Sequence, residues 1–179
     1  MTSSQDIVRY YQGETHDGGG RLLSEVQNWP DESLERVHDF IQWMFPLKER
    51  SMFSPAAPVL DDRTVSAFKS SPSLRANLLV SFERMLRFYG LELVHTPSLQ
   101  IKRSSAFAQR SGEWITPGNH NHLRITRILR SLTLLGLAEE ANAFFECLSD
   151  IYKSQDKQRL PISEETLEFW RAAVSKSVD

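Results

Sequence analysis

The chain has 179 residues, 23 acidic and 21 basic side chains, a net charge of −2 and one cysteine. This charge gives no general attraction to nucleic acid or to anionic membranes, and a single cysteine excludes an intrachain disulfide and a cysteine-based zinc site. No apolar run approaches the ~20 residues that cross a bilayer, and the N-terminus lacks the pattern of a signal peptide. We therefore expect a soluble, cytoplasmic protein with a single domain over residues 1–179.

The N-terminal part is predicted to form short helices around a glycine loop. The segment "SQDIVRYYQG" favours a short helix that ends at Gly13. Three consecutive glycines in "THDGGGR" disfavour helix and strand, so this segment is expected to be a loop. A second short helix is predicted over "RLLSEVQNW".

The next helix is predicted over residues 30–45. Pro30 suits a first helical turn, and Pro46 ends the helix because the residue before a proline is pushed out of the α region. On a helical wheel, His38 falls in an apolar stripe with Gln42 at its edge, whereas Trp43 lies on the other side. This pattern predicts a central helix, in which His38 and Gln42 either form a hydrogen-bonded packing network or line a ligand pocket.

The middle of the chain is predicted to be helical and then irregular. Asp61 or Asp62 is expected to cap a short helix, and a long helix follows from Ser71-Pro72 to Gly90. Residues 95–118 are expected to form a long connecting segment, in which "LQIKR" gives a weak strand signal.

The C-terminal part has the clearest helical spacing. Asn119 or Asn121 is expected to cap a helix that ends at Gly136, a second helix is predicted over residues 138–153, and a third begins at Ser163. Together these elements predict an all-α fold, a single compact helical bundle of about six or seven helices.

Two groups of polar residues are candidate sites. His38, His120 and His122 would suit a three-histidine metal site, but residues i and i+2 point apart on a helix, so that site requires the helix to begin after His122. Arg124, Arg127 and Arg130 are predicted to lie opposite the apolar stripe of their helix. That face is either solvated and paired with carboxylates, or binds an anion or a peptide carboxylate.

Several segments resemble the conserved region of the opioid growth factor receptor family, including its compact bacterial members. They occur in the family order, and the resemblance is strongest over residues 10–150. The segments are "YYQGETHDGGGRLLSEVQNW" (10–29), "LERVHDFIQWMFP" (34–46), "APVL" (57–60), "MLRFYGLEL" (85–93) and "HNHLRITRILRSLTLLGL" (120–137).

The resemblance implies a receptor-like binding role without catalytic residues. Vertebrate members of the family are receptors for the pentapeptide Met-enkephalin, restrain cell proliferation and associate with nuclear and perinuclear membranes. This chain ends soon after the shared region, so we do not expect the long repetitive C-terminal tail of those receptors.

We therefore interpret the chain as a non-enzymatic module that binds a peptide or a small anionic ligand, with no cofactor, no metal and no nucleic acid partner. The alternatives are a metal-dependent enzyme that uses the three histidines, and a purely structural interaction domain that exposes Phe40 and Trp43. The oligomeric state is left open. The expected ligand-binding residues are His38, Asp39, Gln42, Trp43, His120, Asn121, Arg124 and Arg127.

Overall fold

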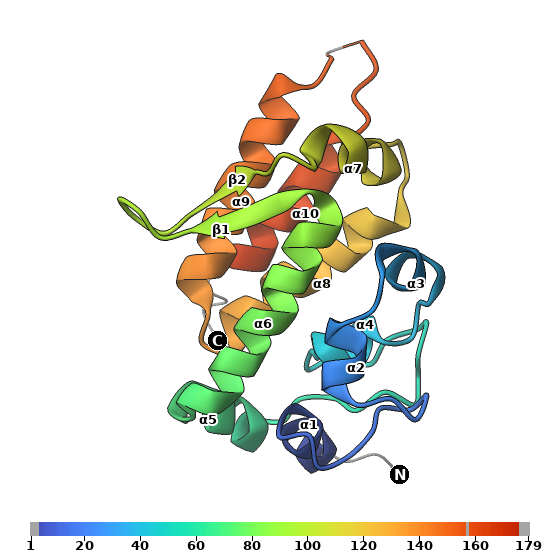
Figure 1. Cartoon of the computed structure of the whole chain (residues 1–179), viewed down its shortest axis with the longest axis vertical. Coiled ribbons are helices and arrows are strands. Elements are labelled where there is room, and N and C mark those ends of the chain that lie inside the picture. The colour runs from blue at the N-terminus through green and yellow to red at the C-terminus, as the bar shows by residue number, and fades with distance from the viewer. Residues whose placement is uncertain (1–3, 157, 176–179) are drawn as a thin grey trace. The chain divides into compact units, whose positions relative to one another are not determined.

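The computed structural model describes residues 4–156 and 158–175 and is predominantly helical (Figure 1). Residue contacts group the chain into two compact units. Unit 1 comprises the chain up to Arg84 together with Leu134–Gly136, and unit 2 comprises Met85–Thr133 and the chain from Leu137 onward. The prediction of a single domain over residues 1–179 stays a prediction.

Unit 1 is built from short helices. They are α1 (Ser4–Tyr11), α2 (Leu23–Gln27), α3 (Asp31–Arg36), α4 (Ile41–Met44), α5 (Asp62–Ser70) and the first part of α6 (Pro72–Tyr89). Asp61 caps α5 by accepting a hydrogen bond from the Thr64 N–H at 2.8 Å, which confirms one of the two predicted caps.

The core of unit 1 gathers side chains from several of these helices. Tyr11 on α1 is buried, packs edge-on against Phe68 on α5 and donates its hydroxyl hydrogen bond to the Met44 carbonyl of α4. Asn77 on α6 donates to the Tyr11 carbonyl at 2.7 Å. One residue thus joins α1 to three other helices.

Unit 2 combines longer helices with a hairpin. Its elements are the end of α6, β1 (Leu91–Val94), β2 (Gln100–Arg103), α7 (Phe107–Trp114), α8 (His120–Leu134), α9 (Ala138–Ser154) and α10 (Glu164–Val174). The strands are antiparallel, with Leu91 opposite Arg103, and both β2 and α10 contact α9 (Figure 1).

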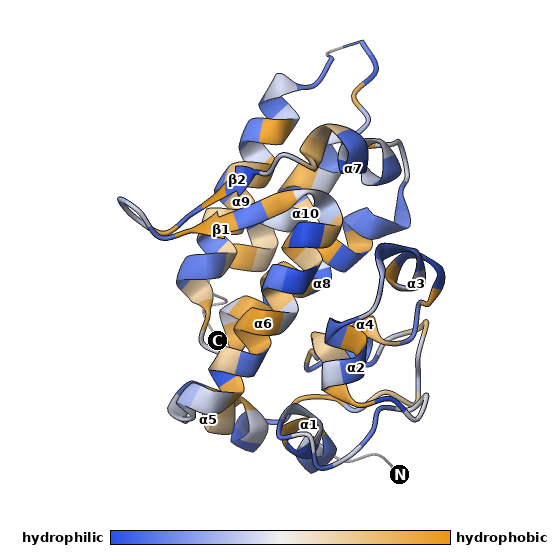
Figure 2. Ribbon diagram, viewed as in Figure 1, coloured by the Kyte–Doolittle hydropathy of each residue, from blue (hydrophilic) through white to orange (hydrophobic). Residues whose placement is uncertain are grey.

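The long helices follow the predicted apolar spacing. In α6 the apolar residues Leu74, Leu78, Phe82, Met85 and Tyr89 recur at spacings of three and four and are all buried. The stripe of α8, formed by Ile125, Ile128, Leu129 and Leu132, is also buried, and Figure 2 shows hydrophobic and hydrophilic residues alternating along α6. Gly90 and Gly136 follow α6 and α8 with φ angles of +77° and +95°, the left-handed conformation that favours glycine at a helix end. Ser163 caps α10 as predicted.

Three predictions about the elements differ from the structure. The predicted helix 30–45 is interrupted at residues 37–40, which separate α3 from α4. This break allows every side chain from Phe40 to Leu47 to be buried, which one face of a single helix does not permit. The 95–118 segment is not a simple connection, because it contains β2 and α7. The described residues form ten helices rather than six or seven, and a two-stranded sheet as well.

Candidate functional site

The predicted site residues His38 and Asp39 lie in the link between α3 and α4. Both are exposed, so His38 is not the half-buried member of an apolar stripe that the helical wheel predicted. The wheel is wrong here because the helix ends before His38. The Asp39 side chain, 56% exposed, accepts a hydrogen bond from Arg21 Nη2 at 2.9 Å.

Arg21 is held on its other side by Asp17, whose side chain is fully buried. Asp17 Oδ2 accepts from Arg21 Nε at 2.7 Å, and Asp17 Oδ1 accepts from the N–H groups of Gly19 and Arg21 at 2.8 and 3.0 Å. The guanidinium carbon lies 5.3 Å from the centre of the Trp29 ring, within range of a cation–π interaction. The hydrogen bonds to Asp17 therefore hold the glycine loop in a turn and fix the orientation of the Arg21 side chain.

The charges around Arg21 keep it ionised. Burial disfavours the charged guanidinium, but hydrogen bonds and charge attraction from Asp17 and Asp39 outweigh this effect and raise the pKa of Arg21. We name these three residues, Asp17, Arg21 and Asp39, the arginine cluster.

The predicted site residues Gln42 and Trp43 are buried, with 5% and 4% of their surface exposed. Trp43 packs edge-on against Tyr10, with ring centres 5.4 Å apart. With its amide nitrogen turned toward the main chain, Gln42 donates to the carbonyls of Asp39 and His38 at 3.2 and 3.3 Å. Both residues pack inside unit 1, which favours the network interpretation of Gln42, and their role as ligand contacts stays a prediction.

The burial of Phe40 and Trp43 also removes the predicted interaction surface. Phe40 is fully buried and packs edge-on against Trp29, with ring centres 5.8 Å apart. Neither side chain is available to a partner helix on the surface of the folded chain.

The other four predicted site residues begin α8 in unit 2. Asn121 is fully buried and Arg124 is 5% exposed, and Arg124 Nη1 donates to Asn121 Oδ1 at 3.3 Å. His120 and Arg127 are half-buried. The predicted solvated arginine face is therefore wrong for Arg124.

The eight predicted residues divide equally between the units, four in each. Because each unit is described by itself, the grouping of all eight into one ligand-binding patch stays a prediction.

His122 links three helices within unit 2. Its Nε2 lies 2.9 Å from the Trp114 carbonyl of α7, and its own carbonyl accepts from Trp170 Nε1 of α10 at 3.1 Å. The two rings meet edge-on with centres 5.7 Å apart. Burial lowers the pKa of His122, although the hydrogen bond to Trp114 opposes this shift.

The predicted three-histidine metal site is not formed. The helix α8 begins at His120 rather than after His122, so the two histidines point in different directions. Within residues 4–156 and 158–175, no group of three or more His, Cys, Asp or Glu side chains is placed to hold a metal ion.

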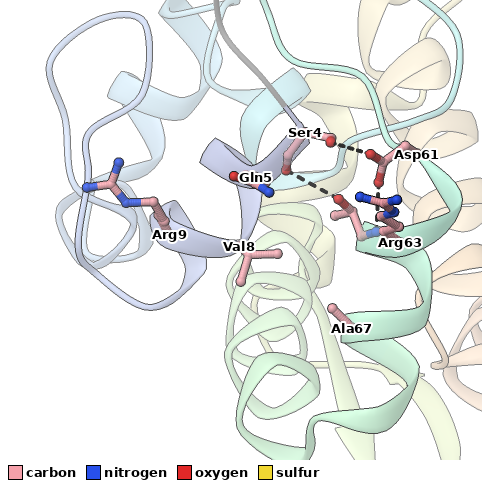
Figure 3. Close-up of a pocket in the computed structure, with 8 residues that line it drawn as sticks. Ser4, Gln5, Val8, Arg9, Asp61, Arg63 and Ala67 are labelled. Carbon is pink, nitrogen blue, oxygen red and sulfur yellow. Dashed lines mark hydrogen bonds between the residues drawn. The ribbon is translucent and has the colours of Figure 1, made fainter.

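A surface pocket of about 510 Å³ lies between α1 and α5 in unit 1 (Figure 3). On α1 it is lined by Ser4, Gln5, Val8 and Arg9. On the α5 side it is lined by Asp61, Arg63, Thr64 and Ala67. We name this site the α1–α5 pocket.

The polar wall of the α1–α5 pocket is organised by Asp61. Its carboxylate accepts from Ser4 Oγ at 2.6 Å and from the Thr64 N–H. These hydrogen bonds lower the pKa of Asp61 to about 2, the bond from Ser4 having the largest effect. Asp61 is therefore negatively charged at neutral pH.

Sequence reasoning missed Arg21 and the α1–α5 pocket. The signal for Arg21 was the segment "DGGGR", in which an aspartate precedes residues able to turn back and donate their N–H groups to it. The pocket had no such signal, because its residues come from two segments far apart in the sequence.

The family model described as the opioid growth factor receptor conserved region matches residues 5–178. The chain belongs to this family. The family segment "LERVHDFIQWMFP" covers the second half of α3, the exposed link with His38 and Asp39, and α4. The segment "HNHLRITRILRSLTLLGL" covers α8.

Curated relatives of this family member are vertebrate proteins. The chain is similar to the opioid growth factor receptor of Mus musculus, at 42% identity over 134 residues, which are 73% of this chain and 21% of the mouse protein. For the Homo sapiens receptor the identity is 41% over 114 residues, or 63% of this chain and 16% of the human protein. The opioid growth factor receptor-like protein 1 of Mus musculus is 34% identical over 133 residues, which are 72% of this chain and 28% of that protein.

The chain thus spans between 16% and 28% of the length of these relatives. The expected compact bacterial type of this family member finds no support among them. No solved structure matches the chain. None of the helices in the described ranges has the length and apolar character needed to span a membrane.

Proposed function

We propose that this member of the opioid growth factor receptor family is a non-enzymatic binding module for a peptide or a small anionic ligand. The observation that carries the proposal is the arginine cluster beside His38. Arg21 is fixed from inside by buried Asp17, whereas Asp39 and His38 are exposed next to it. A charged group held in place before binding loses little conformational freedom when a ligand arrives.

The arginine cluster offers a hydrogen-bond donor for the carboxylate end of a peptide and an acceptor for its ammonium end. Arg21 uses Nε and Nη2 for Asp17 and Asp39, and Nη1 makes no hydrogen bond to the residues that the structure describes. Nη1 is therefore the donor for a ligand carboxylate or carbonyl. The exposed Asp39 carboxylate is the acceptor for a peptide ammonium group, and the Trp29 ring adds an aromatic surface.

The printed name of the relatives, opioid growth factor receptor, supports a peptide ligand. In unit 2, His120 and Arg127 are half-buried and lie on a family segment, and we keep them as separate candidate ligand-binding residues. Gln42, Trp43, Asn121 and Arg124 are assigned to packing. We place the protein in the cytoplasm.

Titration calorimetry of the protein with Met-enkephalin tests the proposal. We expect saturable binding that weakens about tenfold in Asp39→Asn and on N-acetylation of the peptide, because both changes remove the same charged hydrogen bond. His38→Ala is expected to weaken binding less. His95→Ala, which removes an exposed histidine of unit 2, is the matched control and leaves the affinity unchanged.

Binding that Asp39→Asn and N-acetylation both leave unchanged contradicts the assigned site, and absence of saturable binding contradicts the peptide ligand. The same samples test the non-enzymatic part of the proposal. The peptide is expected to be recovered intact by mass spectrometry, and its conversion to a product shows catalysis.

A further inference from the structure

The α1–α5 pocket shares no residue with the site proposed above, and its chemistry is different. One part of its wall is apolar, formed by Val8 on α1 and Ala67 on α5. In Figure 3 these two side chains lie at the same end of the pocket, away from the Ser4–Asp61 hydrogen bond. Because water gains little from contact with such a surface, this part favours an apolar group of a ligand.

The opposite part of the wall carries a cation that is available to a ligand. Arg63 is exposed, and it forms no ion pair with the residues described by the structure. The nearby Asp61 carboxylate is already engaged by Ser4 Oγ and the Thr64 N–H. Arg63 attracts the Asp61 carboxylate only at longer range, and its exposed guanidinium can still bind a ligand.

A second cation flanks the pocket on α1. Among the residues that the structure describes, the Arg9 side chain pairs with exposed Glu14, with Nε and Oε2 3.9 Å apart, and such surface pairs contribute little. Figure 3 shows Arg9 and Arg63 on opposite sides of the pocket. The lining thus carries two positive charges and the single negative charge of Asp61, which favours a monoanion and disfavours a dianion.

We propose that the α1–α5 pocket binds a monocarboxylate that carries a small apolar group, with the carboxylate at Arg63 and the apolar group on Val8 and Ala67. Arginine suits this role because its planar N–H groups bind both oxygens of a carboxylate. Two sources share the chemistry: the C-terminal residue of a peptide, and a free short-chain acid. Gln5 lies between the apolar end and Ser4 and supplies an amide for a peptide main chain.

The test is a titration of isotope-labelled protein followed by the NMR shifts of backbone amides. The probes are N-acetyl-L-valine for the peptide terminus, butyrate for the free acid, N-acetyl-L-valine amide as the uncharged control and inorganic phosphate as an anion that is largely divalent above neutral pH. We expect saturable shifts at Thr64 and Ala67 with one or both carboxylates, and no saturation with the amide. The carboxylate that binds more tightly identifies the source.

The matched variants are Arg63→Gln and Lys69→Gln, which each remove one exposed positive charge from α5. Arg63 lines the pocket, whereas Lys69 does not. Arg63→Gln is expected to weaken carboxylate binding about tenfold, and Lys69→Gln to leave it unchanged. Ala67→Phe keeps every charge but fills the pocket, and is expected to abolish the shifts.

The proposal is overturned by any of three results. They are no saturable shifts with either carboxylate, equal affinity for N-acetyl-L-valine and its amide, and equal loss in Arg63→Gln and Lys69→Gln. Tighter binding of phosphate than of both carboxylates overturns the preference for a monoanion. None of these results bears on the arginine cluster, because the peptide test above uses different residues.

Discussion

The two units of the chain differ in the length of their helices. In unit 1 the complete helices, α1 to α5, have four to nine residues and are joined by polar contacts to main-chain groups. Asn77 donates to the Tyr11 carbonyl and the buried Arg84 donates to the Trp29 carbonyl at 2.7 Å. In unit 2, α8 and α9 have 15 and 17 residues, and the fully buried rings of Trp114, Phe144 and Trp170 lie on α7, α9 and α10.

Helix length affects how stable each helix is on its own. A helix of four to nine residues is unstable alone, because few hydrogen bonds offset the entropy of ordering its first turn. The short helices of unit 1 therefore depend on specific side chains that each satisfy main-chain groups elsewhere. The longer helices of unit 2 need an apolar stripe and a few large side chains to pack against it. Four predictions test this contrast.

The largest expected fall in stability follows removal of a buried aromatic ring in unit 2. Trp170→Ala removes a fully buried side chain and its hydrogen bond to the His122 carbonyl, so we expect the free energy of unfolding to fall by about 3 to 5 kcal/mol. Phe169→Ala is the matched control, because its neighbouring ring is 56% exposed, and it should change stability by about 0.5 kcal/mol or less. Chemical denaturation measures both, and equal losses would contradict the aromatic packing of unit 2.

The second prediction compares the loss of stability when one glycine from each unit is replaced by alanine. Gly90 and Gly13 have φ angles of +77° and +75°, but a Cβ at Gly90 would lie 2.7 Å from the Phe107 Cα, whereas a Cβ at Gly13 meets no atom within 4 Å. Gly90→Ala is expected to destabilise the protein by about 3 kcal/mol, and Gly13→Ala by about 1 kcal/mol from backbone strain alone. Thermal unfolding of the two variants measures the difference, and similar midpoints would show that Phe107 gives way.

A third effect separates the two carboxylates of the arginine cluster. Asp17→Asn removes a buried charge that accepts from Arg21 and from the glycine loop, and should destabilise unit 1 by about 2 to 3 kcal/mol. Asp39→Asn changes an exposed partner of the same arginine, with an expected loss of about 0.5 kcal/mol. Urea denaturation distinguishes them. If Asp39→Asn is the more harmful change, Asp17 does not organise the loop.

The smallest expected effect is a dependence of stability on pH in unit 2. Burial lowers the pKa of folded His122 below its usual 6.5, so the unfolded chain binds a proton at higher pH than the folded chain does. Stability is therefore complete above about pH 6.5 and falls as the pH decreases below that value. We expect His122→Gln to reduce this decrease between neutral and mildly acidic pH, and exposed His95→Gln to leave it unchanged. Identical pH profiles for wild type and His122→Gln would contradict this role of His122.

The same contrast explains which elements could be predicted from the sequence. The helices α6, α8, α9 and α10 follow their apolar spacing, and Gly90, Gly136 and Ser163 mark their ends because a helix end has local chemical requirements. The break at residues 37–40 has no local signal. It depends on burial of Phe40 against Trp29, a contact that spacing within one helix does not reveal.

The candidate site was predictable only in part for the same reason. His38 and Asp39 were expected on one helix, but the helix break places them in an exposed link. Arg124 was expected opposite the apolar stripe of its helix, on a face that is either solvated or binds an anion. The structure buries it beside Asn121, and this pairing depends on the tertiary surroundings of α8.

The long helix α6 limits how this protein can be divided into fragments for expression. The boundary between the units falls inside α6, between Arg84 and Met85, and unit 1 also includes Leu134–Gly136 from much later in the chain. A gene fragment that stops at Arg84 would leave the last turn of a helix with unpaired carbonyl groups and would omit part of its own unit. The two units are therefore best expressed and inherited as one piece, which agrees with a family match that runs through both of them, from residue 5 to residue 178.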